Sequence, residues 1–249
     1  MVEDGLFKLF PCDAIFALHN MPGFPMGQFG FKAGSFMASS DTVNLIITGR
    51  GGHGSAPHLS ADPVVASAHI IVALQSIVSR NVDPREMAVV TVGAIHAGNA
   101  PNVIPDAVEM RLTVRSYTPQ VRQQLRDRIT EVVHAQAATF NCKASVDYQW
   151  RYPALINSDG PTAFARQVAV DWLGDSGLIP DLQPLTGSED FSFMLEECPG
   201  CYLIIGNGVG DTHGTGGCMV HNPGYDFNDA CLPIAASYWV KLVDKFLAA

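Results

Sequence analysis

The chain has few charged residues and no surplus of basic ones. Its 249 residues include 15 lysines and arginines against 24 aspartates and glutamates, which gives a formal net charge of −9. None of the basic residues gathers into a run. Proteins that bind nucleic acids generally present a basic face to the phosphates, so this balance argues against a nucleic-acid partner. A small molecule or a peptide fits the charge better.

Long apolar runs and a regular cysteine framework are also missing. No apolar stretch approaches the length that crosses a bilayer, and residues 1–4 are acidic where a signal peptide would be basic. The six cysteines are scattered, and only Cys198 and Cys201 have the CxxC spacing of redox and zinc sites, with no second such pair nearby. Cytosolic thiols normally stay reduced. We therefore expect a cytoplasmic protein that does not associate with a membrane.

The apolar content is high enough for a substantial core, at 47% hydrophobic residues. The middle of the chain follows the order strand, helix, strand, strand, helix, strand, with Ser60 and Thr118 as the predicted N-caps of the two helices. This order is a split βαβ unit that can stand as a small domain. The predicted ranges are 42–49, 61–79, 88–95, 108–117, a helix from Pro119 with an apolar stripe at Val121, Leu125, Ile129, Val132 and Ala135, and 143–152.

Apolar strands and helices also lie on either side of this unit. Residues 14–18 and 201–205 have the pattern of buried strands, and helices are predicted over 161–173 and 227–247. Residues 1–9 resemble the last turns of a helix, and no capping residue precedes them. We therefore expect either an unusual start or a missing upstream part.

The simplest architecture is an α/β fold with two domains. Residues 1–38 and 153–249 form one domain, and residues 39–152 are inserted between them as the second. The sequence shows no internal repeat and no low-complexity tract, so a repeat protein is not expected.

A glycine-rich loop at residues 49–58 is the first candidate site. It follows a predicted strand and holds His53 among four glycines that could take positive φ or approach a ligand closely. The alternative is a mobile turn with a solvated histidine. The pattern alone leaves both interpretations open.

Two further histidines lie near predicted strand ends. His19 directly follows an apolar strand, His221 follows the loop after another, and each precedes an asparagine. Open α/β sheets build ligand crevices at such strand ends, and neutral imidazole is a common zinc ligand. Catalytic zinc needs about three protein ligands and one open position. The alternative is that each histidine only forms a hydrogen bond to a loop.

Seven short motifs occur along the chain in a fixed order. They are Leu18-His19-Asn20, Gly51-Gly52-His53-Gly54, Pro57-His58, Asp62-Pro63, Asn102-Val103-Ile104-Pro105, Gly187-Ser188-Glu189-Asp190-Phe191 and His221-Asn222-Pro223-Gly224-Tyr225-Asp226-Phe227. These motifs and their order resemble the amidohydrolase branch of the M20 metallopeptidases, which contains hippurate hydrolases, N-acyl-amino-acid deacylases and auxin-conjugate hydrolases. The resemblance implies a metal-binding catalytic domain interrupted by a ferredoxin-like lid that also forms the dimer.

The resemblance also implies a role for each matching residue. His19 and His221 match ligands of a divalent metal, zinc or manganese, of which two ions are expected in the complete protein. His53 matches the lid histidine that reaches into the partner subunit's site and polarises the scissile carbonyl. Asn102 matches a lid residue that contacts substrate across the dimer. The implied substrate is an N-acyl amino acid, cleaved to a carboxylate and a free amino acid.

The chain departs from the family pattern in its metal ligands. The family's Cys-Gly-His-Asp-Gly-His-like segment and its Glu-Glu pair are absent, so at most two of five ligand positions remain. We therefore expect the C-terminal portion of a longer hydrolase, inactive by itself. Arg115 and Arg151 are candidates for binding the substrate carboxylate, since Tyr152 stands where some relatives have arginine. Glu189 and Asp190 are expected to cap the following helix.

Two alternatives to the amidohydrolase stay open. The first is a noncatalytic dimerisation or ligand-binding module, either a fragment or a pseudoenzyme that lacks the upstream ligands. The second is an exopeptidase that acts on dipeptides with the same machinery and a different acyl pocket.

Overall fold

The computed structural model describes residues 1–210 and 216–248, and it divides the chain into two compact units. The predicted boundaries, after residues 38 and 152, each lie two residues from those of the structure. The structure also assigns the short segment 186–189 to the inserted unit. Unit 1 consists of Met1–Phe36, Leu155–Leu185 and Asp190–Ala249, and unit 2 of Met37–Ala154 and Thr186–Glu189.

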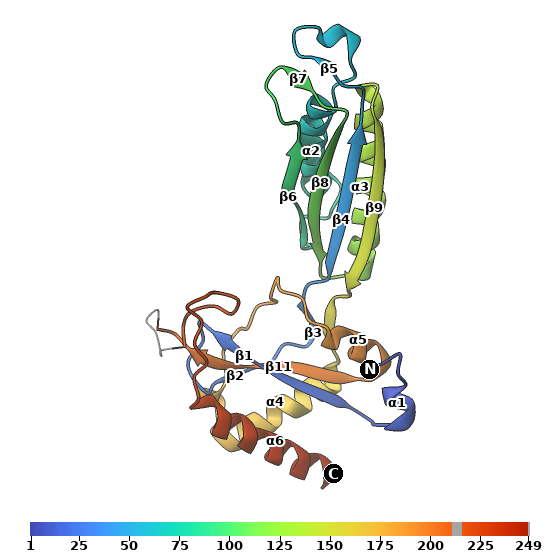
Figure 1. Cartoon of the computed structure of the whole chain (residues 1–249). Helices are drawn as coiled ribbons and strands as arrows, with labels where there is room; N and C mark the ends of the chain where they lie inside the picture. The colour runs from blue at the N-terminus through green and yellow to red at the C-terminus, as the bar shows by residue number, and fades with distance from the viewer. Residues whose placement is uncertain (211–215, 249) are drawn as a thin grey trace. The chain divides into compact units, whose positions relative to one another are not determined.

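Unit 2 is a four-stranded antiparallel sheet with two helices packed against one face (Figure 1). The strand order is β6-β8-β4-β9, and the chain order confirms the predicted strand and helix sequence. A small two-stranded ribbon, β5 with β7, lies at one end of this sheet. The elements are β4 (Ser40–Thr48), β5 (Gly52–His53), α2 (Pro63–Arg80), β6 (Ala88–Ala97), β7 (Val103–Ile104), β8 (Ala107–Ser116), α3 (Pro119–Thr139) and β9 (Lys143–Tyr152).

The two helices of unit 2 differ in how well their starts were predicted. Thr118 caps α3, as predicted. The N-cap of α2 is Asp62 and not Ser60, because the Asp62 carboxylate accepts hydrogen bonds from the amides of Val64 and Val65 at 2.8 and 3.3 Å. The Ser60 hydroxyl instead donates to a carbonyl of the preceding 3-10 turn. A carboxylate at this position also interacts favourably with the helix dipole.

The core of unit 2 lies between the sheet and the two helices. The fully buried positions of α3 continue at every fourth residue, to Val133 and Ala137. Of the last two members of the predicted stripe, Val132 is partly buried against this core, whereas Ala135 is exposed and the prediction is wrong for it. The helix residues in this core are Ala66, Ile70, Leu74 and Ile77 of α2 and Val121, Leu125, Ile129, Val133 and Ala137 of α3.

Helix α2 is long and apolar enough, by length and composition alone, to cross a membrane. The expectation that no stretch reaches this length is therefore wrong for this helix. Its buried face belongs to the core of unit 2. The opposite face carries exposed apolar side chains at Val64, Val65 and Val72.

A buried carboxylate joins three elements of unit 2. The Asp41 side chain is fully buried and accepts hydrogen bonds from two guanidinium nitrogens of Arg122, Nε at 2.9 Å and Nη2 at 2.6 Å. It also accepts from the Tyr148 hydroxyl at 3.1 Å and from the backbone amide of Arg151 at 3.0 Å. The Arg122 guanidinium also stacks 4.6 Å from the ring centre of Trp150. Burial, together with the charge of Asp41, raises the pKa of Tyr148. This cluster fixes β4, α3 and β9 to one another.

Unit 1 is built on a three-stranded sheet with β11 at its centre, parallel to β1 and antiparallel to β2. All nine residues of β11 are buried, and α4 and α6 pack beside each other on the sheet (Figure 1). The elements are α1 (Leu6–Leu9), β1 (Ile15–Pro22), β2 (Phe29–Gly30), α4 (Asp159–Leu173), α5 (Phe191–Glu197), β11 (Gly200–Gly208) and α6 (Cys231–Leu247); β3 (Gly34–Met37) pairs with β10 (Leu155–Asn157).

Both terminal helices of unit 1 are shorter than predicted. The first spans only Leu6–Leu9, because residues before it form a turn that ends at Gly5 with a φ of 87°. The last begins at Cys231 and not near residue 227, because the Asn228 side chain accepts from the Ala230 amide and forms a local turn ahead of the helix. Side chains of the Asx type favour such turns.

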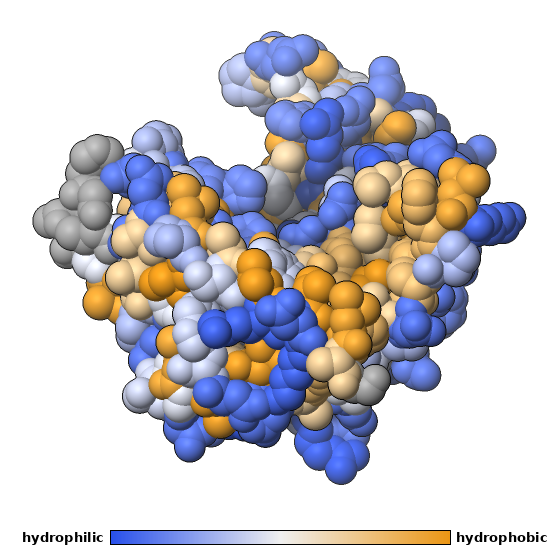
Figure 2. Space-filling view, turned by 90° about the horizontal axis from the view of Figure 1, so that it is seen from below, coloured by the Kyte–Doolittle hydropathy of each residue, from blue (hydrophilic) through white to orange (hydrophobic). Residues whose placement is uncertain are grey.

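Helix α6 has apolar residues on more than the face that meets the sheet. In the view of Figure 2, apolar side chains form patches between polar ones on this side of the molecule. A helix that is apolar on several sides is typical of a buried position in a larger fold. The exposed apolar residues of α6 are Leu232, Val240, Val243, Phe246 and Leu247.

The CxxC cysteines do not form a pair. The Cys201 thiol is buried in the core of unit 1, and burial raises its pKa to about 12. The Cys198 sulfur lies 3.7 Å from that of Cys12, and burial is the main cause that raises the pKa of Cys198 to about 11. Thiols with such pKa values are protonated near neutral pH and are poor metal ligands.

Candidate active site

His19 lies near the end of β1, where it is paired in register with Ile204 of β11. Its Nδ1 is 2.5 Å from the carbonyl oxygen of Asn20. A carbonyl oxygen can only accept, so Nδ1 carries the proton and Nε2 keeps its lone pair. His19 also lines a cavity of about 290 Å³ with Phe227 and Trp239. The imidazole is therefore in the tautomer that offers Nε2 as a ligand.

His221 lies in the segment that joins β11 to α6. Its side chain is exposed, and its φ of 64° falls in the left-handed region, which is unfavourable for residues other than glycine. Asn20 follows His19 in β1, and its side-chain amide donates a hydrogen bond to the hydroxyl of Tyr225, which lies in the same segment as His221. The structure thus brings the two histidine-bearing segments of unit 1 side by side.

The described residues do not form a complete metal site. Among residues 1–210 and 216–248, no group of three His, Cys, Asp or Glu side chains is arranged to hold a metal ion. His19 and His221 supply two imidazoles, whereas catalytic zinc uses about three protein ligands. The residues of this chain therefore fit part of a donor set and do not fit a whole one.

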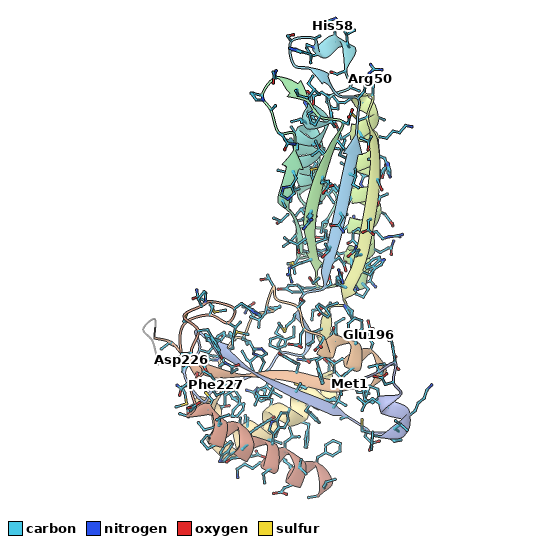
Figure 3. The ribbon with its side chains drawn as sticks, viewed as in Figure 1. Met1, Arg50, His58, Glu196, Asp226 and Phe227 are labelled. Carbon is cyan, nitrogen blue, oxygen red and sulfur yellow. The ribbon has the colours of Figure 1, made fainter. Side chains whose placement is uncertain are left out.

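His53 has the opposite tautomer to His19. Its Nδ1 accepts from the backbone amide of Ser55 at 3.1 Å and lies 2.8 Å from the Ser55 hydroxyl. A backbone amide can only donate, so the neutral ring carries its proton on Nε2. His53 is exposed in β5 at the β5–β7 end of unit 2, and the same loop carries Arg50 and His58, which Figure 3 labels. It can therefore offer Nε2–H to an acceptor outside its own loop.

The glycines of this loop serve close approach and not positive φ. None of the four has a positive φ. A Cβ at Gly49 would lie 2.1 Å from the carbonyl oxygen of Ala61, and one at Gly51 would lie 2.6 Å from that of Ile104. The expectation of left-handed backbone is wrong, and the close approach seen here is to the protein's own backbone, so the expected approach to a ligand stays a prediction.

Asn102 and Arg115 lie at different ends of unit 2. The Asn102 carbonyl accepts from the Gly54 amide at 2.8 Å, which places Asn102 beside the His53 loop. Arg115 lies near the far end of β8, where its guanidinium donates to the carbonyl of Thr186 at 3.2 Å. At about 3.4 Å per residue, β8 separates these ends by roughly 30 Å. Within one copy, therefore, Arg115 and His53 cannot contact the same small substrate.

Two smaller expectations fare differently. Asp190 occupies the N-cap position of α5 but forms no side-chain capping hydrogen bond, so the predicted capping is wrong for this residue. Arg151 is the other candidate for binding the substrate carboxylate. Its guanidinium donates to the Gln149 side chain at 2.8 Å and its backbone amide donates to Asp41, and the binding of a substrate by Arg151 stays a prediction.

The model of peptidase family M20/M25/M40 matches residues 1–245. The chain belongs to this family. It is 39% identical to hippurate hydrolase of Campylobacter jejuni over 99% of this chain and 63% of that protein. It is 36% identical to N-acetyl-L-cysteine deacetylase of Bacillus subtilis, over 96% of this chain and 55% of that protein.

A solved structure agrees with these relatives. The YXEP protein of Bacillus subtilis, described as a dinuclear metal-binding peptidase of the M20 family, superposes with a TM-score of 0.77 at 27% identity. The match covers 97% of this chain and 58% of that one. The α/β fold is thus confirmed, and this M20 chain spans between about half and two thirds of the length of these proteins.

Proposed function

We propose that this chain is part of a metal-dependent amidohydrolase that cleaves N-acyl amino acids, with hippurate as the model substrate. The hydrogen bond between Asn20 and Tyr225 is the observation that carries the proposal, because it holds the segments of His19 and His221 together. The names of the relatives, hippurate hydrolase and N-acetyl-L-cysteine deacetylase, support the substrate class.

The metal in this proposal is zinc or manganese, with two ions in the complete protein. Imidazole ligands suit either cation, and a structural relative is described as dinuclear. The other ligands would come from a part of the protein that the relatives have and this chain does not span. The exposed apolar side of α6 supports such a part, since it offers a surface for it.

His53 has a role distinct from metal binding in this account. Its Nε2–H can donate to the scissile carbonyl oxygen and stabilise the negative charge that develops there. Because Arg115 lies at the other end of β8, we propose that His53 and Asn102 act on a substrate held by a second subunit. Arg115 of that second subunit would then bind the carboxylate of the same substrate.

The second subunit would dock on unit 2. Strand β6 is at the edge of the sheet and, in the described part of the chain, pairs only with β8. Helix α2, on the same side, exposes apolar residues at Val64, Val65 and Val72. An open edge beside an apolar helix face is suited to a symmetric contact.

Replacing Val72, which is 72% exposed, by glutamate is expected to weaken this dimer at least tenfold. The introduced charge would have to be desolvated twice, once in each copy. Sedimentation velocity at several concentrations measures the effect. The matched control is Val240→Glu on α6, 60% exposed in unit 1, which should leave the association unchanged. A monomeric parent chain, or equal effects of the two variants, contradicts the proposed interface.

The activity is tested with hippurate. The 249-residue chain with added zinc or manganese should release no glycine, whereas the protein with its complete reading frame should release it. Turnover by the 249-residue chain alone would show that its ligands suffice. No turnover by the complete protein would favour the noncatalytic module, which the incomplete donor set of this chain also allows.

A further inference from the structure

A buried asparagine at the end of β11 contacts both ends of the segment that carries His221. Asn207 is 0% exposed. Its Nδ2 donates to the carbonyl oxygens of Gly216 and Asp226 at 3.0 and 3.1 Å. Its Oδ1 accepts from the Asn228 amide at 3.0 Å. One side chain therefore binds the backbone both before and after His221.

The first of these contact points allows no side chain. Gly216 has a φ of 73°, and a Cβ there would lie 1.8 Å from the carbonyl oxygen of Asn207. The Gly216 backbone also forms a β-bridge with Gly210. The beginning of the segment is thus held directly against the end of β11.

The second contact point lies where the segment returns to α6, at the labelled residues Asp226 and Phe227 of Figure 3. Between the two points, His221 is exposed and has its left-handed φ of 64°. Such a conformation is strained and persists where the surrounding structure imposes it. The amide of Asn207 is the group that fixes both ends around it.

We propose that Asn207 is the positioning residue of segment 216–228: its three hydrogen bonds set the path of this segment and so the placement of His221 beside β1. The importance of that placement for catalysis rests on the proposed function, whereas the fixing of the segment does not.

A second asparagine provides a matched control. Asn157 is 2% exposed, and its Nδ2 donates to the carbonyl oxygens of Lys32 and Tyr202, both at 2.9 Å. Its Oδ1 accepts from the Tyr202 amide at 2.7 Å. Like Asn207, Asn157 is buried, donates two hydrogen bonds and accepts one, but none of its partners lies in segment 216–228.

The test compares amide hydrogen exchange in Asn207→Ala and Asn157→Ala of the 249-residue chain. Both variants should lower the Tm by a similar few degrees. Exchange within 216–228 should become at least tenfold faster in Asn207→Ala and change less than twofold in Asn157→Ala. Equal exchange of this segment in the two variants would overturn the proposal.

A second variant separates the bonds and covers the case in which the alanine variant does not fold. Asn207→Asp keeps the acceptor for the Asn228 amide and loses both donors. The Asn228 amide should stay protected while the Tyr225 amide exchanges faster; no change at Tyr225 would contradict the proposal. Hippurate cleavage by the protein with its complete reading frame distinguishes the two accounts, because absent turnover there rejects the proposed function and leaves the exchange result standing.

Discussion

Replacing Asp41 by asparagine is expected to lower the free energy of unfolding by about 3 to 5 kcal/mol, the range for breaking one partner out of a buried ion pair. The substitution leaves the Arg122 guanidinium, which is 13% exposed, without its counter-charge. It also weakens the hydrogen bonds that join β4, α3 and β9 at this point.

Urea unfolding followed by circular dichroism measures this loss. The control is Asp83→Asn, which breaks the ion pair with Arg85 at 2.7 Å. Both partners of that pair are solvent-exposed, at 42% and 88%, so water and salt screen it and the loss should be far smaller. Similar losses in the two variants would show that the Asp41 cluster does not stabilise unit 2.

The second large effect is expected at His53 in the complete protein. His53→Ala should lower kcat by about 10²- to 10³-fold, the usual effect of losing one donor to a developing oxyanion. Bound metal, measured by elemental analysis, should not change. His58→Ala, in the same exposed loop, is the matched control and should retain most of the activity.

The neighbouring Ser55 refines this experiment. Its backbone amide, which remains in any variant, is one of the two groups that hold Nδ1 of His53. Ser55→Ala should therefore cost much less activity than His53→Ala. Parallel losses of metal and activity in His53→Ala would make His53 a ligand and reject its role at the carbonyl.

Capping residues and hydrophobic periodicity predicted an element well where a single local pattern decides where that element begins. Thr118 and Pro119 placed the start of α3, and the strand and helix order of unit 2 followed from periodicity. The start of α2 was misplaced because Ser60 and Asp62 are both good caps, and only their tertiary surroundings decide between them. The start of α6 failed because the Asn228 side chain forms a turn there and not a cap.

In the candidate site, too, local sequence patterns indicated some residues, whereas contacts between distant parts of the chain had no such pattern. Strand ends and neighbouring asparagines indicated His19 and His221, but the contact between Asn20 and Tyr225 joins residues 205 positions apart and has no local signature. Asn207 was missed for the same reason, although an asparagine between two glycines at a strand end is a signal that could have found it. The distance between Arg115 and His53 became visible only with the strand pairing of β8.

We propose that His19 and His221 bind one shared cation, one of the two ions of the complete protein, and zinc titration of the 249-residue chain by calorimetry tests this most directly. The parent chain should bind zinc weakly, and after purification it should carry less than one ion per chain. The weak binding should be lost equally in His19→Ala, His221→Ala and the double variant. His53→Ala should bind like the parent. Two independent, additive losses, or unchanged binding in either single variant, would contradict a shared site.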